Sequence, residues 1–158
     1  INISTNGVYL ADAKRQEKVI DSGLDALIFS VDGASQEVYE RYRRGGNFDK
    51  AVEAMRGILA KRRALGAKKP TIVWRYILFH WSDSDAEMSR ARAIATEIGV
   101  DYFTYHLNCV RPEDSSTRFY PGSPEWHKVE HDMFFNVEQR VMQQYLPGFS
   151  PDVPVTTA

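Results

Sequence analysis

The feature that most constrains the fold is a regular alternation of strand-like and helix-like stretches along the chain. Four short apolar stretches, rich in β-branched and aromatic residues, have the composition of buried strands. Between them, apolar residues recur every three or four positions, as they do on one face of a helix. This alternation predicts an α/β fold in which helices cover a parallel sheet. The predicted strands are 1–4, 24–31, 71–79 and 100–107, and the predicted helices are about 10–22, 35–44, 47–65 and 84–98.

The middle of the chain illustrates both patterns. Asn47 is a good N-cap, and the helix after it carries one apolar stripe made of Phe48, Val52, Met55, Ile58 and Leu59. The stretch 71–79 is β-branched and aromatic, with Arg75 as its only charge. About four parallel strands of this kind form either an open twisted sheet or part of a (β/α) barrel. In both architectures ligands bind at the carboxyl ends of the strands.

Composition excludes several classes of function. Twenty Lys and Arg oppose 21 Asp and Glu, so a net charge of −1 gives no reason to expect nucleic acid or an anionic membrane as partner. No apolar run approaches the roughly 20 residues that span a bilayer. The single cysteine, Cys109, excludes a disulfide framework and any metal site built only from this chain's thiolates. These features favour a cytoplasmic location.

Polar residues gather where the predicted strands end. The four clusters are Thr5-Asn6-Gly7, Ser30-Val31-Asp32-Gly33, His80-Trp81-Ser82-Asp83 and His106-Leu107-Asn108. Side chains alternate between the two faces of a strand, so Ser30 and Asp32 point the same way, and together they could bind a hydroxylated ligand. The alternative is that Ser30 satisfies backbone groups and Asp32 begins an ordinary turn.

Three further side chains at or near these ends leave two interpretations open. Arg75 either points into a barrel, toward an anionic ligand or a carboxylate such as Asp32, or lies paired on the opposite face under a helix. His80 and His106 either contact a ligand or only cap and pack the strand ends.

The order and spacing of these clusters resemble the radical S-adenosylmethionine (SAM) enzymes, in particular their SPASM-like branch. Thr5-Asn6-Gly7 ends one strand and Ser30-Val31-Asp32-Gly33 ends the next. Arg43 and Arg44 then precede Gly45-Gly46 and the helix start Phe48-Asp49. The resemblance covers about residues 1–122. It implies a partial (β/α) barrel, of which this chain would be the later part.

The resemblance also implies a reaction and its cofactors. Such enzymes reductively cleave SAM with a [4Fe–4S] cluster, held by a CxxxCxxC loop, to give a 5′-deoxyadenosyl radical. The loop is absent here, so we expect the cluster ligands before residue 1, no metal ligand in this chain, and no activity of the chain alone. The expected partners are an electron donor and an unidentified small-molecule or peptide substrate.

Site residues follow from the same resemblance. Arg43, or Arg44 if the register differs by one, would pair with the SAM carboxylate, as a planar guanidinium suits. The expected SAM contacts are Thr5, Asn6, Ser30, Asp32 and Arg43. The possible further contacts with SAM or substrate are Arg75, His80, His106 and Asn108.

The domain organisation follows as well. After the barrel part at 1–122, the sequence predicts an amphipathic helix at 123–148 that packs on the barrel, and an extended or disordered tail at 149–158. Two alternatives stay open for the whole chain. It is a fragment of another (β/α) barrel enzyme, or a degenerate barrel that serves as a binding or scaffold module.

Overall fold

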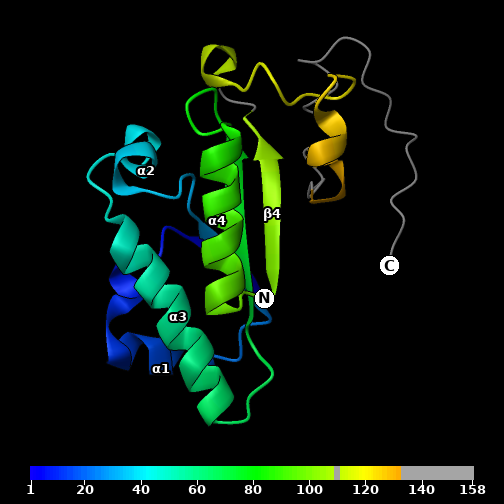
Figure 1. Ribbon diagram of the computed structural model, residues 1–158. Coiled ribbons are helices and arrows are strands. Elements are labelled where there is room, and N and C mark those ends of the chain that lie inside the picture. Colours follow the sequence, from blue (N-terminus) through cyan, green and yellow to red (C-terminus); the bar gives the residue numbers. More distant parts are fainter. Residues whose placement is uncertain (109–110, 133–158) are drawn as a thin grey trace.

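The structure is a computed structural model that describes residues 1–108 and 111–132 (Figure 1). Four parallel strands form one sheet in the order β1-β2-β3-β4. The strands are β1 (Asn2–Thr5), β2 (Ala26–Ser30), β3 (Thr71–Leu78) and β4 (Tyr102–Leu107). The α-helices are α1 (Ala13–Asp21), α2 (Gln36–Tyr42), α3 (Phe48–Ala64) and α4 (Asp85–Ile98). The predicted α/β class with four parallel strands is confirmed.

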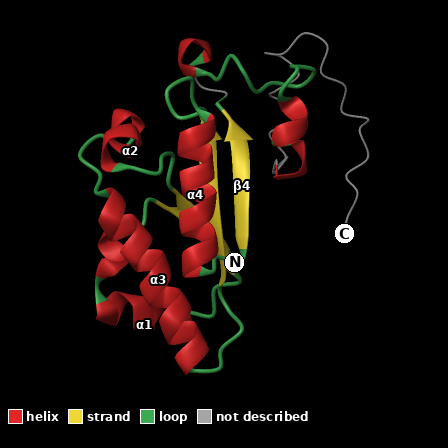
Figure 2. Ribbon diagram, in the orientation of Figure 1, coloured by secondary structure: helices red, strands yellow, loops and turns green. Residues whose placement is uncertain are grey.

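The order of the strands decides between the two predicted architectures. Each strand pairs with the next one along the chain, and the order never reverses as it does in a doubly wound sheet. Because βαβ crossovers are right-handed, an unreversed order places the helices on one face of the sheet. In Figure 2 the four α-helices lie together on one side of the strands. This is the arrangement of part of a (β/α) barrel.

The core lies between that face and the helices. Leu27 and Phe29 of β2 and Trp74 and Tyr76 of β3 are at most 2% exposed and pack against buried residues of α3 and α4. On β4, the side chain in register with Tyr76 is Tyr105, and the two rings meet edge to face at 5.7 Å. Alternate residues of the strands therefore face the helices.

The remaining residues of each strand lie on the other face, which no described helix covers. On β3 these residues are Val73, Arg75 and Ile77, each only partly buried. Two of their register partners, Ile28 of β2 and His106 of β4, are partly buried too. We call this side the open face, and in a barrel it corresponds to the interior.

Side-chain caps fix the helix starts. Asn47 Oδ1 accepts from the Lys50 N–H at 2.8 Å, as predicted for α3. At α4 the N-cap is Ser84, whose Oγ accepts from the Glu87 N–H at 3.2 Å. The stretch 10–22 differs from its prediction, because a 3-10 helix (Val8–Ala11) comes first and Asp12 caps α1 at Ala13. No helix among the described residues is long and apolar enough to cross a membrane.

The segment predicted as the start of a long amphipathic helix is also different. Residues Trp126–Lys128 and Glu130–Asp132 form two short 3-10 helices, separated by Val129. Val129 is 1% exposed and has φ −127°, which interrupts helical geometry while its side chain enters the core. Residues 133–148 of the predicted helix, and the predicted tail 149–158, lie outside the described residues.

Candidate functional site

The open face carries a polar pair where β2 ends. Ser30 and Arg75 are register partners on adjacent strands, and Arg75 Nη2 donates to Ser30 Oγ at 2.5 Å. Ser30 is only 2% exposed. Arg75 Nε is buried and has no hydrogen-bond partner among the described residues. Of the two interpretations of Arg75, the one that directs it away from the helices is confirmed.

Thr104 extends this pair across the sheet. It is the register partner of Arg75 on β4, and its Oγ1 is likewise buried without a hydrogen-bond partner among the described residues. Ser30, Arg75 and Thr104 therefore form a row of three polar side chains, which we call the polar row. Buried polar atoms are rarely left unsatisfied, so the two free atoms call for a ligand or ordered water. The sequence prediction missed Thr104, although it lies two positions before His106 and so on the same face of β4.

His106 lies two residues closer to the carboxyl end of β4 than Thr104, and therefore on the same face of the sheet. Burial, together with the positive charge of Arg75, lowers the pKa of His106 to about 4. The imidazole is therefore neutral at pH 7 and offers one donor and one acceptor nitrogen. This places a neutral hydrogen-bonding group beside the cationic Arg75.

Asp32 is fully buried just beyond β2, and its carboxylate already has partners. Oδ1 accepts from the Ile77 N–H at 2.9 Å, while Oδ2 accepts from Arg43 Nε at 2.8 Å and lies 2.7 Å from Arg43 Nη2. Burial raises the pKa of the Asp32 carboxyl, and the guanidinium of Arg43 opposes that effect. The interaction ties the residue after α2 to the ends of β2 and β3. Arg43, predicted to bind an external carboxylate, binds this internal one.

Thr5 and Asn6 form a local turn. Thr5 Oγ1 accepts from the Gly7 N–H at 3.0 Å, and Asn6 Oδ1 accepts from the Val8 N–H at 3.4 Å. The register of Thr5 with Phe29 directs the Thr5 side chain to the helix-covered face. Thr5 is thus not brought together with Ser30 on the open face.

The turn at Gly7 requires glycine for two reasons. Its φ is 76°, and an added Cβ would lie 2.6 Å from the ring of Phe29. The tight turn lets the chain pass directly from β1 over the core.

His80 and Asn108 hold the segment that follows β4. The His80 N–H donates to the Asp114 carbonyl at 3.1 Å, and Asn108 Nδ2 donates to the Arg111 carbonyl at 2.6 Å. The His80 ring is exposed and meets Trp81 edge to face at 4.7 Å. Trp81 Nε1 is a third buried atom without a hydrogen-bond partner among the described residues.

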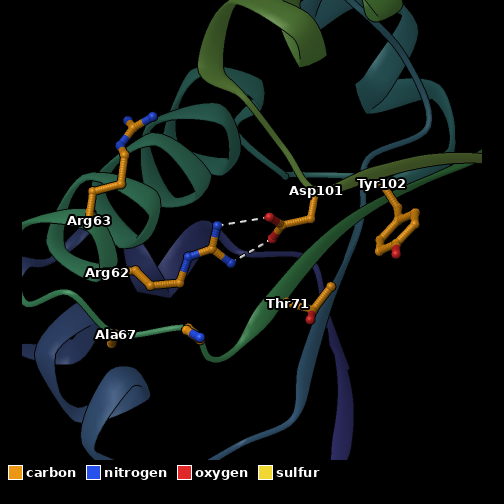
Figure 3. Close-up of a pocket in the computed structure, with 7 residues that line it drawn as sticks. Arg62, Arg63, Ala67, Thr71, Asp101 and Tyr102 are labelled. Atoms are coloured by element: carbon orange, nitrogen blue, oxygen red, sulfur yellow. Dashed lines mark hydrogen bonds and ion pairs between the residues drawn. The ribbon is translucent and has the colours of Figure 1, made fainter.

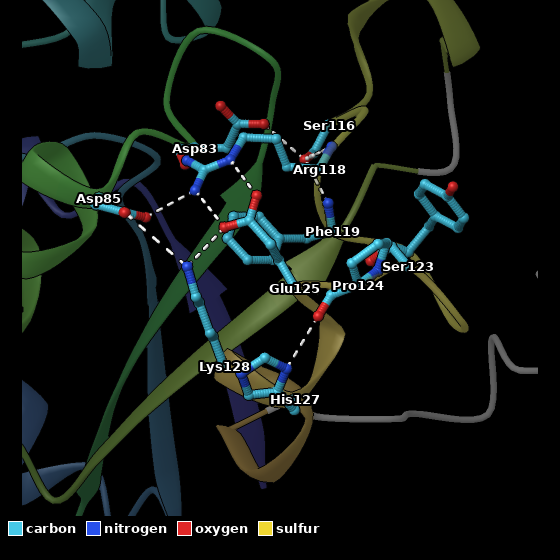
Figure 4. Close-up of polar contacts among 11 residues, drawn as sticks. Asp83, Asp85, Ser116, Arg118, Phe119, Ser123, Pro124, Glu125, His127 and Lys128 are labelled. Atoms are coloured by element: carbon cyan, nitrogen blue, oxygen red, sulfur yellow. Dashed lines mark hydrogen bonds and ion pairs between the residues drawn. The ribbon is translucent and has the colours of Figure 1, made fainter.

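A network that the sequence prediction missed fastens the same segment to the start of α4 (Figure 4). Ser116 Oγ donates to Asp83 Oδ2 at 2.6 Å, and both residues are buried. Arg118 donates to the Asp83 carbonyl, to Asp85 and to both carboxylate oxygens of Glu125. The hydrogen bonds that Glu125 accepts from Arg118 and from Lys128 lower its pKa to about 2. No short motif marks the bonds that join Asp83 and Asp85 to Ser116 and Arg118, because these residues are more than 30 positions apart.

The described residues do not supply a metal site. No three His, Cys, Asp or Glu side chains among them come together as metal ligands. Cys109 lies outside the described residues, and a cubane cluster held by three thiolates needs more cysteines than the sequence contains. The residues of this chain therefore do not fit a [4Fe–4S] cluster, whereas the unsatisfied polar row fits an organic ligand with anionic and hydroxyl groups.

Comparison with known proteins gives one partial match. No family model matches the chain. A stretch of 69 residues, 44% of this chain, is 36% identical to GTP 3′,8-cyclase of Limosilactobacillus fermentum, a radical SAM enzyme. The match spans only 19% of that protein. It supports a relationship to the radical SAM superfamily, and it gives no support to the SPASM-like branch.

Proposed function

We propose that this chain is part of a radical SAM enzyme and that it binds SAM on the open face, at the carboxyl ends of its strands. The observation that carries the proposal is the polar row of Ser30, Arg75 and Thr104, with two buried polar atoms that lack partners. The partial likeness to a radical SAM enzyme supports the same assignment. The substrate is an unidentified small molecule or peptide.

Arg75 is the proposed partner of the SAM carboxylate. Its Nε–H is unsatisfied, and its Nη2 already orients it through Ser30. Arg43 is the second candidate, but its Nε and Nη2 both contact Asp32. Releasing Arg43 would leave a fully buried carboxylate without its counter-charge, which is costly. Geometry therefore favours Arg75 over Arg43.

The other proposed contacts surround this arginine. Ser30 supplies a hydroxyl, Thr104 an unpartnered hydroxyl, and His106 a neutral imidazole. Thr5, Asn6 and Asp32 contribute by holding the turns at the ends of β1 and β2. His80, in the loop after β3, and Asn108, directly after β4, are proposed to contact SAM or substrate from these strand ends.

SAM supplies radical chemistry when it is reductively cleaved, and the residues of this chain bind and orient it. The thiolates that hold a cluster would have to come from outside these 158 residues, because Cys109 is the only cysteine. We therefore expect the isolated chain to bind SAM weakly and to form no 5′-deoxyadenosine when it is supplied with iron, sulfide and a strong reductant. Product formation would contradict this expectation.

The test is a titration of the ¹⁵N-labelled chain with SAM, followed by backbone amide shifts. A second titration uses 5′-methylthioadenosine, which lacks the amino-acid carboxylate. Arg75→Gln should weaken SAM binding about ten- to a hundredfold, since a charge-assisted hydrogen bond contributes about 1.5–3 kcal/mol. It should leave 5′-methylthioadenosine binding unchanged.

Arg43→Gln is the matched comparison. It should lower stability through Asp32 and reduce SAM affinity less than Arg75→Gln does. A larger loss in Arg43→Gln would show that Arg43, not Arg75, binds the carboxylate. If SAM shifts no amide near Ser30 or Arg75, the SAM-binding proposal fails, and the scaffold or other-barrel alternatives gain support.

A further inference from the structure

A groove lies at the opposite end of the sheet from the polar row. It is bounded by the end of α3, the loop that leads into β3, and the first residues of β3 and β4 (Figure 3). Its volume is about 480 Å³, within the range of about 300–1,000 Å³ typical of small-molecule sites. The lining residues are Arg62, Arg63, Ala67, Lys68, Thr71, Asp101 and Tyr102. The amino ends of the strands are not where a (β/α) barrel binds its substrate, so this groove is separate from the proposed SAM site.

The groove is positively charged. Its lining has three cations and one carboxylate, an excess of two positive charges, although the whole chain carries −1. Arg63 and Lys68 are exposed and have no acidic partner among the described residues. A dianion such as a phosphate monoester would match this excess.

One wall of the groove is already fixed. Arg62 and Asp101 form a two-point interaction, with Nη1 to Oδ2 at 2.6 Å and Nη2 to Oδ1 at 2.8 Å. Asp101 Oδ2 also accepts from the Ile72 N–H, and Arg62 Nη1 donates to the Pro70 carbonyl. Both charges of this pair are thus engaged within the protein. The cations left for a ligand are Arg63 and Lys68.

The opposite wall offers a ring. Tyr102 is 62% exposed, which is high for an aromatic side chain, and it lies next to Thr71 at the edge of the groove in Figure 3. An exposed ring beside unpaired cations suits a ligand with a planar group and a phosphate. The Thr71 hydroxyl adds a donor between the two.

From this arrangement we propose that the groove at the amino ends of β3 and β4 binds a small phosphate monoester with a planar ring, such as a nucleoside monophosphate. Lys68 binds the phosphate together with Arg63, whose exposed guanidinium points away from the Arg62–Asp101 pair in Figure 3 and has to turn toward the ligand. The Arg62–Asp101 pair forms a rigid wall, and Tyr102 stacks on the ring. The site does not depend on SAM binding.

The test uses uridine monophosphate as the probe, with inorganic phosphate and uridine in parallel titrations of the ¹⁵N-labelled chain. Uridine monophosphate should shift the amides of Lys68, Thr71 and Tyr102 and bind more tightly than either part alone. Arg63→Gln and Lys68→Gln should each weaken it about tenfold, as expected for loss of one charge-assisted contact. Tyr102→Ala should weaken the binding of uridine monophosphate and leave the binding of inorganic phosphate unchanged.

Lys50→Gln is the matched control. Lys50 is an exposed lysine in the first turn of α3, about 20 Å along the helix from Arg63. An equal loss in Lys50→Gln would show that the attraction is general electrostatics, and the proposal would be wrong. It would also be wrong if the shifts appeared near Ser30 instead, or if none appeared at 10 mM probe, about the weakest binding that a specific site would show. Arg75→Gln should leave this binding intact, so the two proposals fail independently.

Discussion

His106 should make the stability of the chain depend on pH between about 6.5 and 4. Burial and the charge of Arg75 lower its pKa to about 4 in the folded chain, against about 6.5 in the unfolded one. Below pH 6.5 the unfolded chain therefore binds a proton that the folded chain does not. The contribution of His106 to the free energy of unfolding is therefore fully present above pH 6.5 and is lost as the pH falls toward 4.

The size of the effect follows from the two pKa values. Between pH 7 and pH 5 the full shift corresponds to a loss of about 2 kcal/mol in the free energy of unfolding. Because the side chain is only partly buried, solvent screening reduces this to about 1–1.5 kcal/mol. His106→Gln keeps a polar side chain of similar size and should remove this part of the pH dependence.

The assay is urea unfolding of the native chain and of His106→Gln at pH 7 and pH 5. Subtracting the two pH differences cancels every other titrating group, Asp32 included. NMR titration of the imidazole then measures the pKa directly. In Arg75→Gln the pKa should rise but stay below 6.5, because burial is the larger cause. Equal pH dependence in the native chain and His106→Gln, or an imidazole pKa near 6.5, would refute the reasoning.

Two substitutions test the packing that positions the site, both by urea unfolding. Gly7→Ala should lower the free energy of unfolding by about 2–4 kcal/mol, because the strain of a positive φ and the clash with the Phe29 ring add together. Gly23→Ala should lower it by only about 1 kcal/mol, because Gly23 also has a positive φ, 70°, but open space around it. A similar loss of stability in both variants would show that the clash with the Phe29 ring contributes nothing. Tyr76→Phe should cost about 1–2 kcal/mol, since the buried hydroxyl donates to the Ser82 carbonyl at 2.7 Å, and an unchanged stability would show that water replaces it.

Much of the fold was predictable because it depends on local patterns. The apolar stripe after Asn47 and the Asn47 cap predicted α3, and the nine residues at 71–79 predicted β3 almost to its last residue. These signals act within one or two turns or along one strand. The end of the described chain was harder, since Val129 enters the core through a contact that no local pattern shows.

The candidate site was predictable in position but not in its pairings. The strand-end rule selected Ser30, and Arg75 was selected as the only charge in its strand, but side-chain alternation could not tell which face of β3 the helices cover. The partner of Arg43 was missed, because the motif suggested the carboxylate of a ligand. The structure instead pairs Arg43 with Asp32 of the same chain. Thr104 went unnoticed, because a threonine in a strand is ordinary until its register partner is known.

The unreversed strand order also bears on how the chain assembles as it is made. Each strand pairs with the one synthesised just before it, and register partners are at most 45 residues apart. A nascent chain can therefore add one strand–helix unit at a time, without waiting for a distant segment. The bond between Ser116 and Asp83 forms only after β4 has left the ribosome. We therefore expect residues 1–108 to gain most of their protection from amide exchange before the segment from Arg111 onward closes over β3.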